Sequence, residues 1–466
     1  MPSLFAPNVV EKEVLPDSLS ERLKYLLGRD LDFHGNEKNS PAHNLHSFPA
    51  KFPPQLPRFF ITHLTAPGEV VLDPMVGSGT TMVEAYLAGR IGIGLDIDVL
   101  ALRISSAKTL QIRRSTALEL GMSVYQNAKK DLLHGKEHLQ DQMTEYFDPE
   151  SKKFINNWFL PQTQLELFAL VRQIRAIDES KYRKFLEVIF SSIIITKMGG
   201  VSLALDLAHT RPHKVKALFD SGGHLLFSEQ GFQPERRHVQ SKILKSAVEE
   251  FRRKLLLSLE SIPNRPSTGR AYLVMGNSQQ LSLTDNSVDL IITSPPYASN
   301  AIDYMRAHKF SLVWLGHKIG QLKRERAKYI GGETISDFPF EELPPRPTEK
   351  IRILSAIDSK RSEVLKRYFS EMKRSLSEMF RVLKPGKICL VGVGNSMMKG
   401  VDTEIPLCLK EIGESVGFEV PAIGERRLDR DRRMMPASHQ ENSESQIQKR
   451  MMKEYVVGFY KPGSGR

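Results

Sequence analysis

Short apolar runs alternate with helical periodicity along much of the chain, a pattern typical of an α/β protein with a parallel sheet. Runs rich in β-branched residues and bounded by turn residues predict buried strands at 70–72, 90–96, 272–275, 288–292, 387–393 and 455–460. Apolar residues at helical spacing predict helices at 82–88, 98–108, 368–382 and 407–416. We therefore predict a Rossmann-like α/β fold, with 455–460 as an antiparallel strand at the edge of the sheet.

The stretch from 115 to 265 interrupts this alternation. Its periodicity is mostly helical, with an amphipathic run at 165–177 and a strongly apolar run at 185–196, and it carries no catalytic motif. We interpret it as a helical insertion with its own core. The expected parts of the chain are an N-terminal segment at 1–40, a first half of the sheet domain at 41–114, the insertion at 115–265 and a second half of the sheet domain at 266–466.

Two further segments have a readable local pattern. Residues 18–27 predict a short helix introduced by Pro16 and Asp17. Residues 317–350 contain a basic run followed by proline-rich polar sequence, which we interpret as a mobile loop.

Composition narrows the setting in which the protein works. A formal net charge of +12 favours a polyanionic partner, because Lys and Arg side chains near a phosphate backbone release counterions. Only two cysteines occur, Cys389 and Cys408, and with the histidines they lack metal-ligand spacing, so no metal is expected. No apolar run approaches the roughly 20 residues of a membrane span, and no secretion signal begins the sequence, so we expect a soluble cytoplasmic protein.

One predicted strand ends in an unusual turn. The run 288–292 is followed by Thr293 and then by Ser294-Pro295-Pro296-Tyr297. Two consecutive prolines fix the backbone, so the carbonyls of Ser294 and Pro295 become stiff acceptors beside the Tyr297 ring. A flipped nucleobase with an exocyclic amine suits such a site, because the base stacks on the ring while its amine donates to these oxygens.

A second strand ends in a glycine-containing turn. Residues 70–72 are followed by Asp73-Pro74-Met75-Val76-Gly77-Ser78-Gly79-Thr80-Thr81 and then by a predicted helix. Gly77 and Gly79 let the backbone approach a ligand closely, and the helix start behind them offers unpaired N–H groups. Asp96 ends the next strand, about 20 residues beyond the turn, where an acidic side chain binds ribose hydroxyls. Neither the dinucleotide fingerprint nor the Gly-Lys-(Ser/Thr) of a phosphate loop is present.

Both motifs resemble those of the amino-methyltransferases of DNA. Ser294-Pro295-Pro296-Tyr297 is similar to their catalytic (Asp/Asn/Ser)-Pro-Pro-(Tyr/Phe/Trp), and 73–81 is similar to their Asp-Pro-Phe-x-Gly-Ser-Gly-Thr-Thr cofactor loop, with Met75 where Phe is usual. The resemblance covers roughly 46–110 and 270–460 and implies the sheet of a class I methyltransferase.

The resemblance also implies the cofactor, S-adenosyl-L-methionine, and a role for each matching residue. Asp73 would hold the amino-acid end of the cofactor, Asp96 its ribose and Asn277 its adenine, while Lys51 and Phe52 would cover its methionine end. The full set implied for cofactor binding is Lys51, Phe52, Asp73, Pro74, Met75, Gly77, Ser78, Gly79, Thr80, Asp96 and Asn277. The set implied for catalysis is Ser294, Pro295, Pro296 and Tyr297.

Among such enzymes, Ser at the first motif position goes mostly with the N4 amine of cytosine, and Asp or Asn with the N6 amine of adenine. We therefore expect a cytosine-N4 methyltransferase that modifies a short sequence of double-stranded DNA, with a cognate restriction endonuclease acting separately. The cofactor motif precedes the catalytic motif, whereas many cytosine-N4 enzymes have the reverse order, so adenine N6 stays open. Methylation at a ring carbon would require a Pro-Cys nucleophile, which neither cysteine provides.

Two other functional classes also stay open. An RNA methyltransferase would use a similar motif on an exocyclic amine, and a non-catalytic DNA-binding subunit would keep the fold without turnover. Failure to bind the methyl donor would favour the second.

DNA contacts are expected in basic stretches. The insertion is the candidate for target recognition by elimination, with basic residues at 209–216, 236–238, 242, 245 and 252–254. A further arginine cluster occupies 425–433, and the loop expected at 317–350, which contains a basic run, lies at the end of the sheet where it would close over DNA. The sequence shows no helix-turn-helix or zinc-finger signature.

Overall fold

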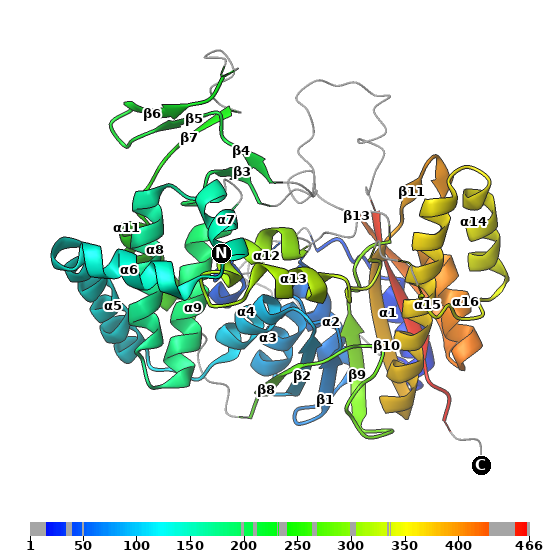
Figure 1. Ribbon diagram of the computed structural model, residues 1–466. Helices are drawn as coiled ribbons and strands as arrows, with labels where there is room; N and C mark the ends of the chain where they lie inside the picture. The colour runs from blue at the N-terminus through cyan, green and yellow to red at the C-terminus, as the bar shows by residue number, and fades with distance from the viewer. Residues whose placement is uncertain are drawn as a thin grey trace, which may run out of the picture.

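A seven-stranded sheet forms the centre of the computed structural model, in the order β13-β14-β10-β9-β1-β2-β8 (Figure 1). The structure describes residues 15–33, 40–48, 51–196, 200–207, 212–230, 232, 240–262, 268–298, 304–332, 335, 337–427 and 453–463, with the side chain of residue 206 excepted. The strands are β1 (Val70–Asp73), β2 (Ile91–Asp96), β8 (Arg270–Met275), β9 (Val288–Thr293), β10 (Leu383–Gly394), β13 (Glu419–Arg427) and β14 (Lys453–Tyr460). β1, β2, β8, β9 and β10 are parallel, and β14 is antiparallel to β10 and β13. The predicted Rossmann-like sheet of the class I methyltransferase type is confirmed.

Helices cover both faces of the sheet because its central strands are apolar on both sides. On one face, α1 (Leu19–Leu27), α2 (Gln55–Leu64) and α3 (Thr80–Leu87) pack around Val71, Leu290 and Leu390. On the other, α14 (Pro345–Ser355), α15 (Ser359–Val382) and α16 (Ile405–Val416) pack around Leu72 and Ile291. Neighbouring residues of one strand therefore enter opposite cores, as the alternation of side chains along a strand requires.

The chain reverses its direction across the sheet between β1 and β9. After β1 it continues outward to β2 and β8, and after β9 it continues the other way to β10. Leu72 lies beside Ile291 in the parallel register, so β1 and β9 end next to each other. Ligands of open α/β sheets bind in the crevice outside the carboxyl ends of the strands at such a reversal.

The region 115–265 is mostly helical, as predicted, and lies beside the sheet (Figure 1). Its helices are α5 (Arg114–His134), α6 (Lys136–Tyr146), α7 (Pro149–Trp158), α8 (Pro161–Arg175), α9 (Ser180–Ile194) and α11 (Ala247–Leu259), and α4 (Val99–Thr109) precedes them. It also holds five short strands, β3 (Ala204–Asp206), β4 (His213–Lys214), β5 (Ala217–Phe219), β6 (Leu225–Ser228) and β7 (Ser241–Ile243), which the helical prediction missed. Strands of two to four residues are too short to produce a clear period-two signal.

The core of this region extends beyond the predicted insertion. Leu100 and Ile104 of α4 belong to it, as do Phe310 and Trp314 in and after α12 (Tyr304–Leu312). The core of the helical part is therefore completed by α4 and α12, which lie outside the predicted bounds.

Two sequence predictions are wrong. The segment 317–350 is not a plain loop, because it contains α13 (Ile319–Arg326) and the first residues of α14. Ile319 and Leu322 bury one side of α13, and Pro345 occupies the first turn of α14, where its missing N–H is not needed. Strand β14 is antiparallel as predicted but does not lie at the edge, since β13 pairs with its outer side.

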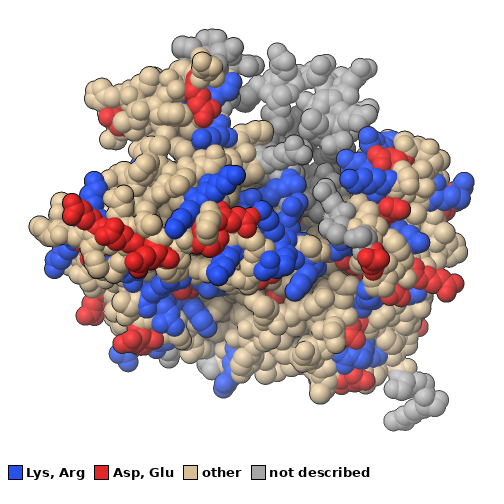
Figure 2. All heavy atoms as spheres, viewed as in Figure 1, with Lys and Arg blue, Asp and Glu red and all other residues tan. Residues whose placement is uncertain are grey.

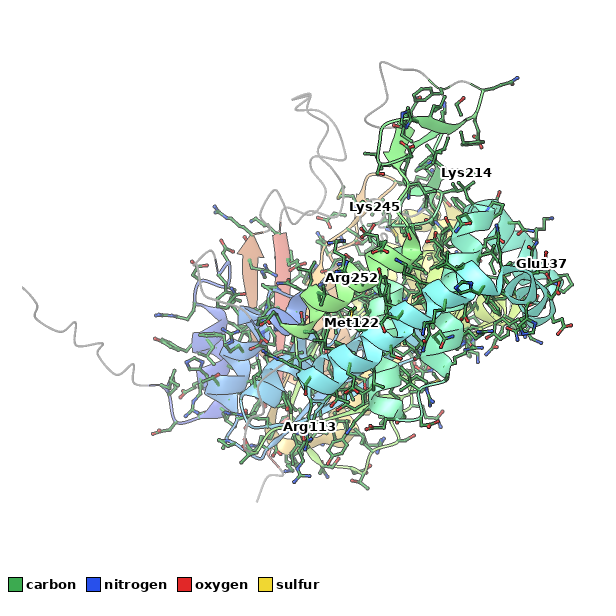
Figure 3. The ribbon with its side chains drawn as sticks, turned by 90° about the vertical axis from the view of Figure 1, so that its left-hand side faces the viewer. Arg113, Met122, Glu137, Lys214, Lys245 and Arg252 are labelled. Atoms are coloured by element: carbon green, nitrogen blue, oxygen red, sulfur yellow. The ribbon has the colours of Figure 1, made fainter. Side chains whose placement is uncertain are left out.

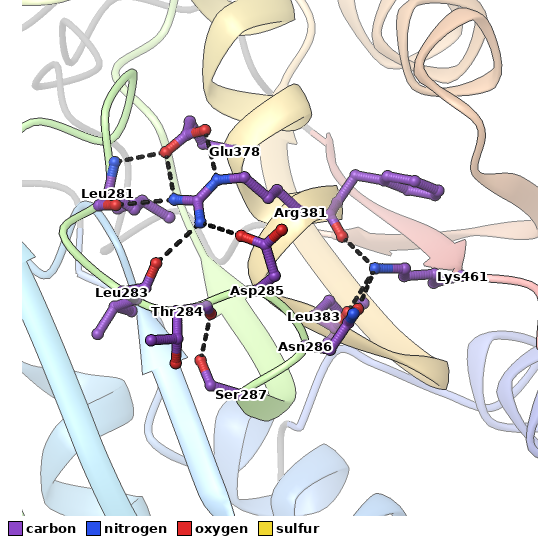
Figure 4. Close-up of polar contacts among 11 residues, drawn as sticks. Leu281, Leu283, Thr284, Asp285, Asn286, Ser287, Glu378, Arg381, Leu383 and Lys461 are labelled. Atoms are coloured by element: carbon purple, nitrogen blue, oxygen red, sulfur yellow. Dashed lines mark hydrogen bonds and ion pairs between the residues drawn. The ribbon is translucent and has the colours of Figure 1, made fainter.

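The connection into β9 is fixed from both sides (Figure 4). Arg381 at the end of α15 donates to the carbonyls of Leu281 and Leu283, each at 2.8 Å. Lys461, just after β14, donates to the side-chain oxygen of Asn286 at 2.7 Å. These bonds hold the amino end of β9, opposite the edge at which its motif lies.

The remaining elements are a 3-10 helix at Pro41–Asn44, β11 (Met397–Met398) and β12 (Val401–Asp402). In the part of the chain that the structure describes, no helix has both the length and the apolar character needed to cross a membrane.

Candidate active site

A pocket that is partly open to solvent lies where β1, β2 and β9 end. Most of the predicted site residues meet in its wall, although they come from five separate segments of the chain. Those in the wall are Lys51, Phe52, Asp73, Pro74, Met75, Gly77, Ser78, Thr80, Asp96, Asn277, Ser294 and Pro296. Gly79, Pro295 and Tyr297 are the predicted residues that do not line it.

Asp73 joins the cofactor strand to the catalytic strand. Thr293, which is fully buried, donates its hydroxyl to Asp73 Oδ1 at 2.7 Å, and the N–H of Met75 reaches the same oxygen at 3.2 Å. Burial raises the pKa of Asp73 to about 6, although the bonds from Thr293 and Thr81 lower it. The last residues of β1 and β9 are therefore held together directly below the pocket.

The glycine turn is supported from behind. Gly77 and Gly79 have φ angles of 47° and 78°, which L side chains rarely adopt. A Cβ on Gly79 would overlap Ser105 of α4. This glycine, which precedes α3, therefore permits close packing between the start of α3 and α4. Lys108 is fully buried and donates to the carbonyl of Ser78 at 2.6 Å. Gly79 therefore shapes the turn without touching the pocket.

Asp96 shapes the turn from the front. Its Oδ2 accepts the N–H of Gly77 at 2.8 Å, and its Oδ1 accepts the N–H of Asp98 at 2.9 Å. Burial raises the pKa of Asp96 to about 7, and the nearby charge of Asp98 raises it further. A carboxyl group that titrates near neutrality thus stands in the pocket wall.

Asp98 ties the pocket to the helices beyond the catalytic motif. It caps α4 by accepting the N–H groups of Leu100 and Ala101, and its Oδ2 also contacts His308 Nδ1 at 2.7 Å and Tyr329 OH at 2.6 Å. Burial alone would raise the pKa of Asp98, but the facing His308 and the hydrogen bonds lower it overall. Tyr329 also lines the pocket, so this cluster positions a part of the wall.

Aromatic side chains form another part of the wall. The rings of Phe48 and Tyr304 stack with centroids 5.1 Å apart and an interplanar angle of 24°, and both line the pocket. Phe48 also lies against Gly77, where an added Cβ would approach it to 3.4 Å. Phe52 packs closely on Gly392 of β10, which leaves no room for a side chain there.

The N-terminal side of the pocket is held by a buried polar cluster. Lys51 donates to the carbonyls of His43 and His46, at 3.0 and 3.1 Å. His43 contacts Glu84 at 2.6 Å, and Glu84 also pairs with Arg58 at 2.7 Å. The segment that contains Lys51 is therefore fixed to α2 and α3.

Asn277 lines the pocket at the end of β8, and its side-chain oxygen accepts the N–H of Gln279 at 3.0 Å. The oxygen thus stabilises the turn that follows the strand.

Tyr297 is bonded away from the pocket. Its hydroxyl donates to Glu454 of β14 at 2.8 Å, and Glu454 pairs with the buried Arg426 of β13 at 2.6 Å. Burial raises the pKa of Tyr297 well above its usual range, and the charge of Glu454 adds to this. The Tyr297 ring is therefore oriented by the last two strands of the sheet.

Sequence reasoning missed several of these residues. Thr293, Phe48 and Asp98 are close in the sequence to predicted site residues, so the sequence could have indicated that they lie near the site. Tyr304 and His308 are four residues apart and so share one helix face, but nothing in that spacing points to Asp98. Tyr329 and Glu454 have no sequence signal at all.

The wall suits S-adenosyl-L-methionine. Asp73, Asp96 and Asp98 bring three carboxyl groups to one pocket, which favours a ligand with positive charge and hydroxyl donors. Phe48, Met75, Ile97 and Ile330 add the apolar surface that a nucleoside needs. Among the described residues, no group of three His, Cys, Asp or Glu side chains could hold a metal ion.

The chain is similar to known DNA methyltransferases. Residues 22–106 match the family model described as DNA methylase (N6_N4_Mtase). The type II methyltransferase M.MvaI of Kocuria varians is 22% identical over 396 residues, covering 82% of this chain and 83% of that protein. M.BsoBI of Geobacillus stearothermophilus is 23% identical over 445 residues, covering 84% and 81%, and M.AvaI of Anabaena variabilis is 26% identical over 385 residues, covering 76% and 74%. Over residues 22–106 the chain is similar to the N6/N4 amino-methyltransferases of DNA, and over most of its length it is similar to type II methyltransferases, which supports S-adenosyl-L-methionine as the cofactor.

Proposed function

We propose that the protein methylates the N4 amine of cytosine within a short sequence of double-stranded DNA, as the modification enzyme of a restriction-modification system. The observation that carries the choice of base is Ser294, the first residue of the catalytic motif, which lines the pocket next to the strand that bears Asp73. The names of the three relatives, all type II methyltransferases, support the restriction-modification role.

The chemical problem is the weak nucleophilicity of an exocyclic amine. Its lone pair is delocalised into the base, so the nitrogen is planar and unreactive. We propose that the Ser294 side chain and the Pro295 carbonyl each accept a hydrogen bond from one N–H of the amine. These two hydrogen bonds draw the nitrogen toward tetrahedral geometry. When bound, S-adenosyl-L-methionine supplies the electrophilic methyl group of a sulfonium. The protein then acts by positioning and by preorganised polar groups, with no covalent enzyme intermediate.

Rigidity of the acceptors is central to this proposal. Pro295 and Pro296 fix the backbone after Ser294, and Thr293 before it is bonded to Asp73. The oxygens that would accept the amine hydrogens are therefore tied to the same carboxyl group that we assign to the amino-acid end of the cofactor. The cofactor and the target base are thus positioned by one connected unit.

We assign the other cofactor contacts by their place in the pocket. Asp96 would accept the ribose hydroxyls, Asn277 would face the adenine, and Lys51 and Phe52 would close the methionine end. Gly77 leaves the backbone open to the ligand, and Ser78 and Thr80 lie beside it. Pro74 and Met75 add apolar surface.

Adenine N6 is the second candidate, favoured by the order of the two motifs. The test is nucleoside mass spectrometry on DNA from cells that express the protein, with long-read sequencing to locate the mark. We expect N4-methylcytosine in one short motif. Detection of N6-methyladenine would agree with the proposed mechanism but contradict the choice of cytosine that rests on Ser294. A methyl mark found only in RNA would contradict the proposal that DNA is the substrate.

Cofactor affinity is expected to depend on pH through Asp96. With a pKa raised to about 7, this carboxyl group is ionised above pH 7 and protonated below it, and only the ionised form accepts both ribose hydroxyls. Between pH 8 and pH 6 the dissociation constant of S-adenosyl-L-methionine should rise by about 10-fold. Isothermal titration calorimetry at pH 6, 7 and 8 measures this change.

The Asp96→Asn variant is the control for that measurement. It should bind the cofactor weakly and with little pH dependence, since the titrating group is gone. If the variant keeps the full pH dependence, another carboxyl group titrates, and Asp73, with a pKa of about 6, would be the next to replace.

The ring and the hydroxyl of Tyr297 are expected to contribute differently. Tyr297→Phe keeps the ring and leaves Glu454 paired with Arg426, so kcat/KM should fall less than about 10-fold. Tyr297→Ala removes the stacking surface for the base, so kcat/KM should fall by about 10- to 100-fold. Steady-state kinetics on a duplex substrate separates the two. Equal losses in both variants would mean that the bond to Glu454, and not the ring, is what matters.

A further inference from the structure

A basic surface covers α13 and the residues that flank it. We call Lys318, Lys323, Arg324, Arg326 and Lys328 the α13 surface; all five side chains are exposed, and Glu325 is the one acidic residue between them. Figure 2 shows Lys and Arg side chains gathered on the face of the molecule where Figure 1 places α7, α12 and α13. The segment 318–328 therefore carries a local net charge of +4 (five basic residues minus one acidic residue).

The α13 surface is held rigidly by the helices below it. Ile319 N–H donates to Ser151 of α7 at 3.3 Å, and Lys323 pairs with Glu150 of the same helix. At its other end, Arg367 of α15 donates to the carbonyl of Ala327 at 3.0 Å. The charges therefore sit on a fixed support, which reduces the entropy lost when they bind a partner.

The same segment continues directly into the pocket wall. Tyr329 follows Lys328, bonds to Asp98 at 2.6 Å, and lines the pocket together with Ile330. Gly331 is fixed in turn, because its N–H donates to Glu371 at 2.7 Å. A polyanion that lies on the α13 surface is thereby placed beside the mouth of the candidate active site.

Another basic group, on α11 and just before it, differs in its charge balance. Figure 3 shows Lys245 and Arg252 on the side of the molecule where α5 and α11 run side by side. Arg252 contacts Glu249 at 3.9 Å, and Lys245 contacts Glu250 at 3.6 Å. Arg253 also pairs with Glu250, at 2.6 Å. Glu249 and Glu250 offset two of the four positive charges at 245 and 252–254, whereas Glu150 and Glu325 offset two of the five on the α13 surface, so α11 is the weaker candidate for phosphate binding.

We propose that the α13 surface docks the sugar-phosphate backbone of the substrate duplex and sets its register on the protein. This inference rests on the proposed function, because it assumes that the substrate is double-stranded DNA. It assigns the backbone contacts to α13, outside the region 115–265 that the sequence alone favoured. Of the basic residues predicted there, 209–211 and 236–238 lie outside the described residues, as do 428–433 of the arginine cluster.

The salt dependence of DNA binding tests this assignment. Each phosphate contact that is lost should reduce the slope of log Kobs against log salt by about 0.9. The double variant Arg324→Gln/Lys328→Gln should therefore lower the slope by about 1.8 and weaken duplex binding on the order of 10-fold, equally for specific and unrelated sequences. Fluorescence anisotropy with a labelled duplex at several salt concentrations measures both values, and cofactor affinity should be unchanged.

The matched control removes two exposed lysines far along the chain from α13. Lys130→Gln/Lys136→Gln, at the junction of α5 and α6, loses the same charge and should keep the wild-type slope. An unchanged slope in Arg324→Gln/Lys328→Gln, with a wild type that binds and methylates duplex DNA, would overturn the proposal. Equal losses in both double variants would overturn it too, since they would reflect net charge alone.

Failure of the proposed function has a different result. If the wild-type protein binds no duplex and leaves no methyl mark in DNA, double-stranded DNA is not its substrate, and the proposed function is wrong. Preferential binding of a labelled single-stranded RNA by the wild type, lost in Arg324→Gln/Lys328→Gln, would move the α13 surface to another nucleic acid and overturn the proposal as stated.

Discussion

Replacing Ser294 with alanine is expected to lower kcat by about 100- to 1,000-fold while changing the dissociation constant of S-adenosyl-L-methionine less than about twofold. The substitution removes one proposed acceptor of an amine hydrogen, and removal of a single preorganised polar contact typically has an effect of this size. Ser294 lines the pocket, but the groups assigned to the cofactor stand on other segments. Single-turnover kinetics on a duplex, together with calorimetry of cofactor binding, measures the two effects separately.

The control lies at the other end of the same strand. Ser287 precedes β9, and its hydroxyl donates to the carbonyl of Thr284 at 2.7 Å, at the opposite edge of the sheet (Figure 4). Ser287→Ala makes the same chemical change and should leave kcat unaltered. The role assigned to Ser294 fails if Ser294→Ala loses its cofactor affinity along with its activity, because the residue would then belong to the cofactor site.

The parts of the fold that the sequence predicts well are those with strong periodic patterns. The runs around Val71 and Ile291 are apolar and β-branched because they are covered on both faces, and such strands are recognisable without a structure. Strand β13 gives no such signal. Residues 420–423 are all of intermediate burial, without a period of two, and the strand ends in Glu425, Arg426 and Arg427, so the segment was interpreted as a charged cluster.

Helix α13 shows the opposite difficulty. Its sequence is dominated by charge, and only Ile319 and Leu322 are buried. Two apolar residues are too few to produce helical periodicity, and the helix is held instead by contacts with α7 that involve Glu150 and Ser151. Tertiary contacts decided the structure of this segment, as they often do for short helices.

The candidate site was predictable as two motifs but not as one unit. Asp73 and Ser294 are each signalled by the strand and turn in which they stand. Their connection through Thr293, a bond between residues 220 positions apart, depends on β1 and β9 being neighbours. The same holds for Tyr297, whose partner Glu454 lies 157 positions away on β14. Sequence motifs thus locate reactive groups, whereas the groups that orient them come from the topology of the sheet.

The second large effect is expected from Gly79→Ala, which should destabilise the protein by about 2–5 kcal/mol and weaken cofactor binding by at least about 10-fold. Gly79 has a φ angle of 78°, and an added Cβ would overlap the Ser105 side chain and lie 2.9 Å from its Cα. The turn can relieve this overlap only by moving away from α4, and Gly77 and Ser78 in the pocket wall would move with it. Urea unfolding and calorimetry with the cofactor measure the two losses.

Gly68→Ala separates strain from overlap. Gly68 has a similar φ angle of 86°, but an added Cβ there meets nothing within 4 Å, so this variant should lose only about 1–2 kcal/mol and keep its cofactor affinity. The double variant Gly79→Ala/Ser105→Gly should recover part of the lost stability, because it removes the Ser105 side chain that the new Cβ would overlap. Removing this hydroxyl breaks no hydrogen bond among the described residues. If Gly79→Ala behaves like Gly68→Ala, the close approach of the turn to α4 does not determine the shape of the pocket, and the cofactor site is more tolerant than its packing indicates.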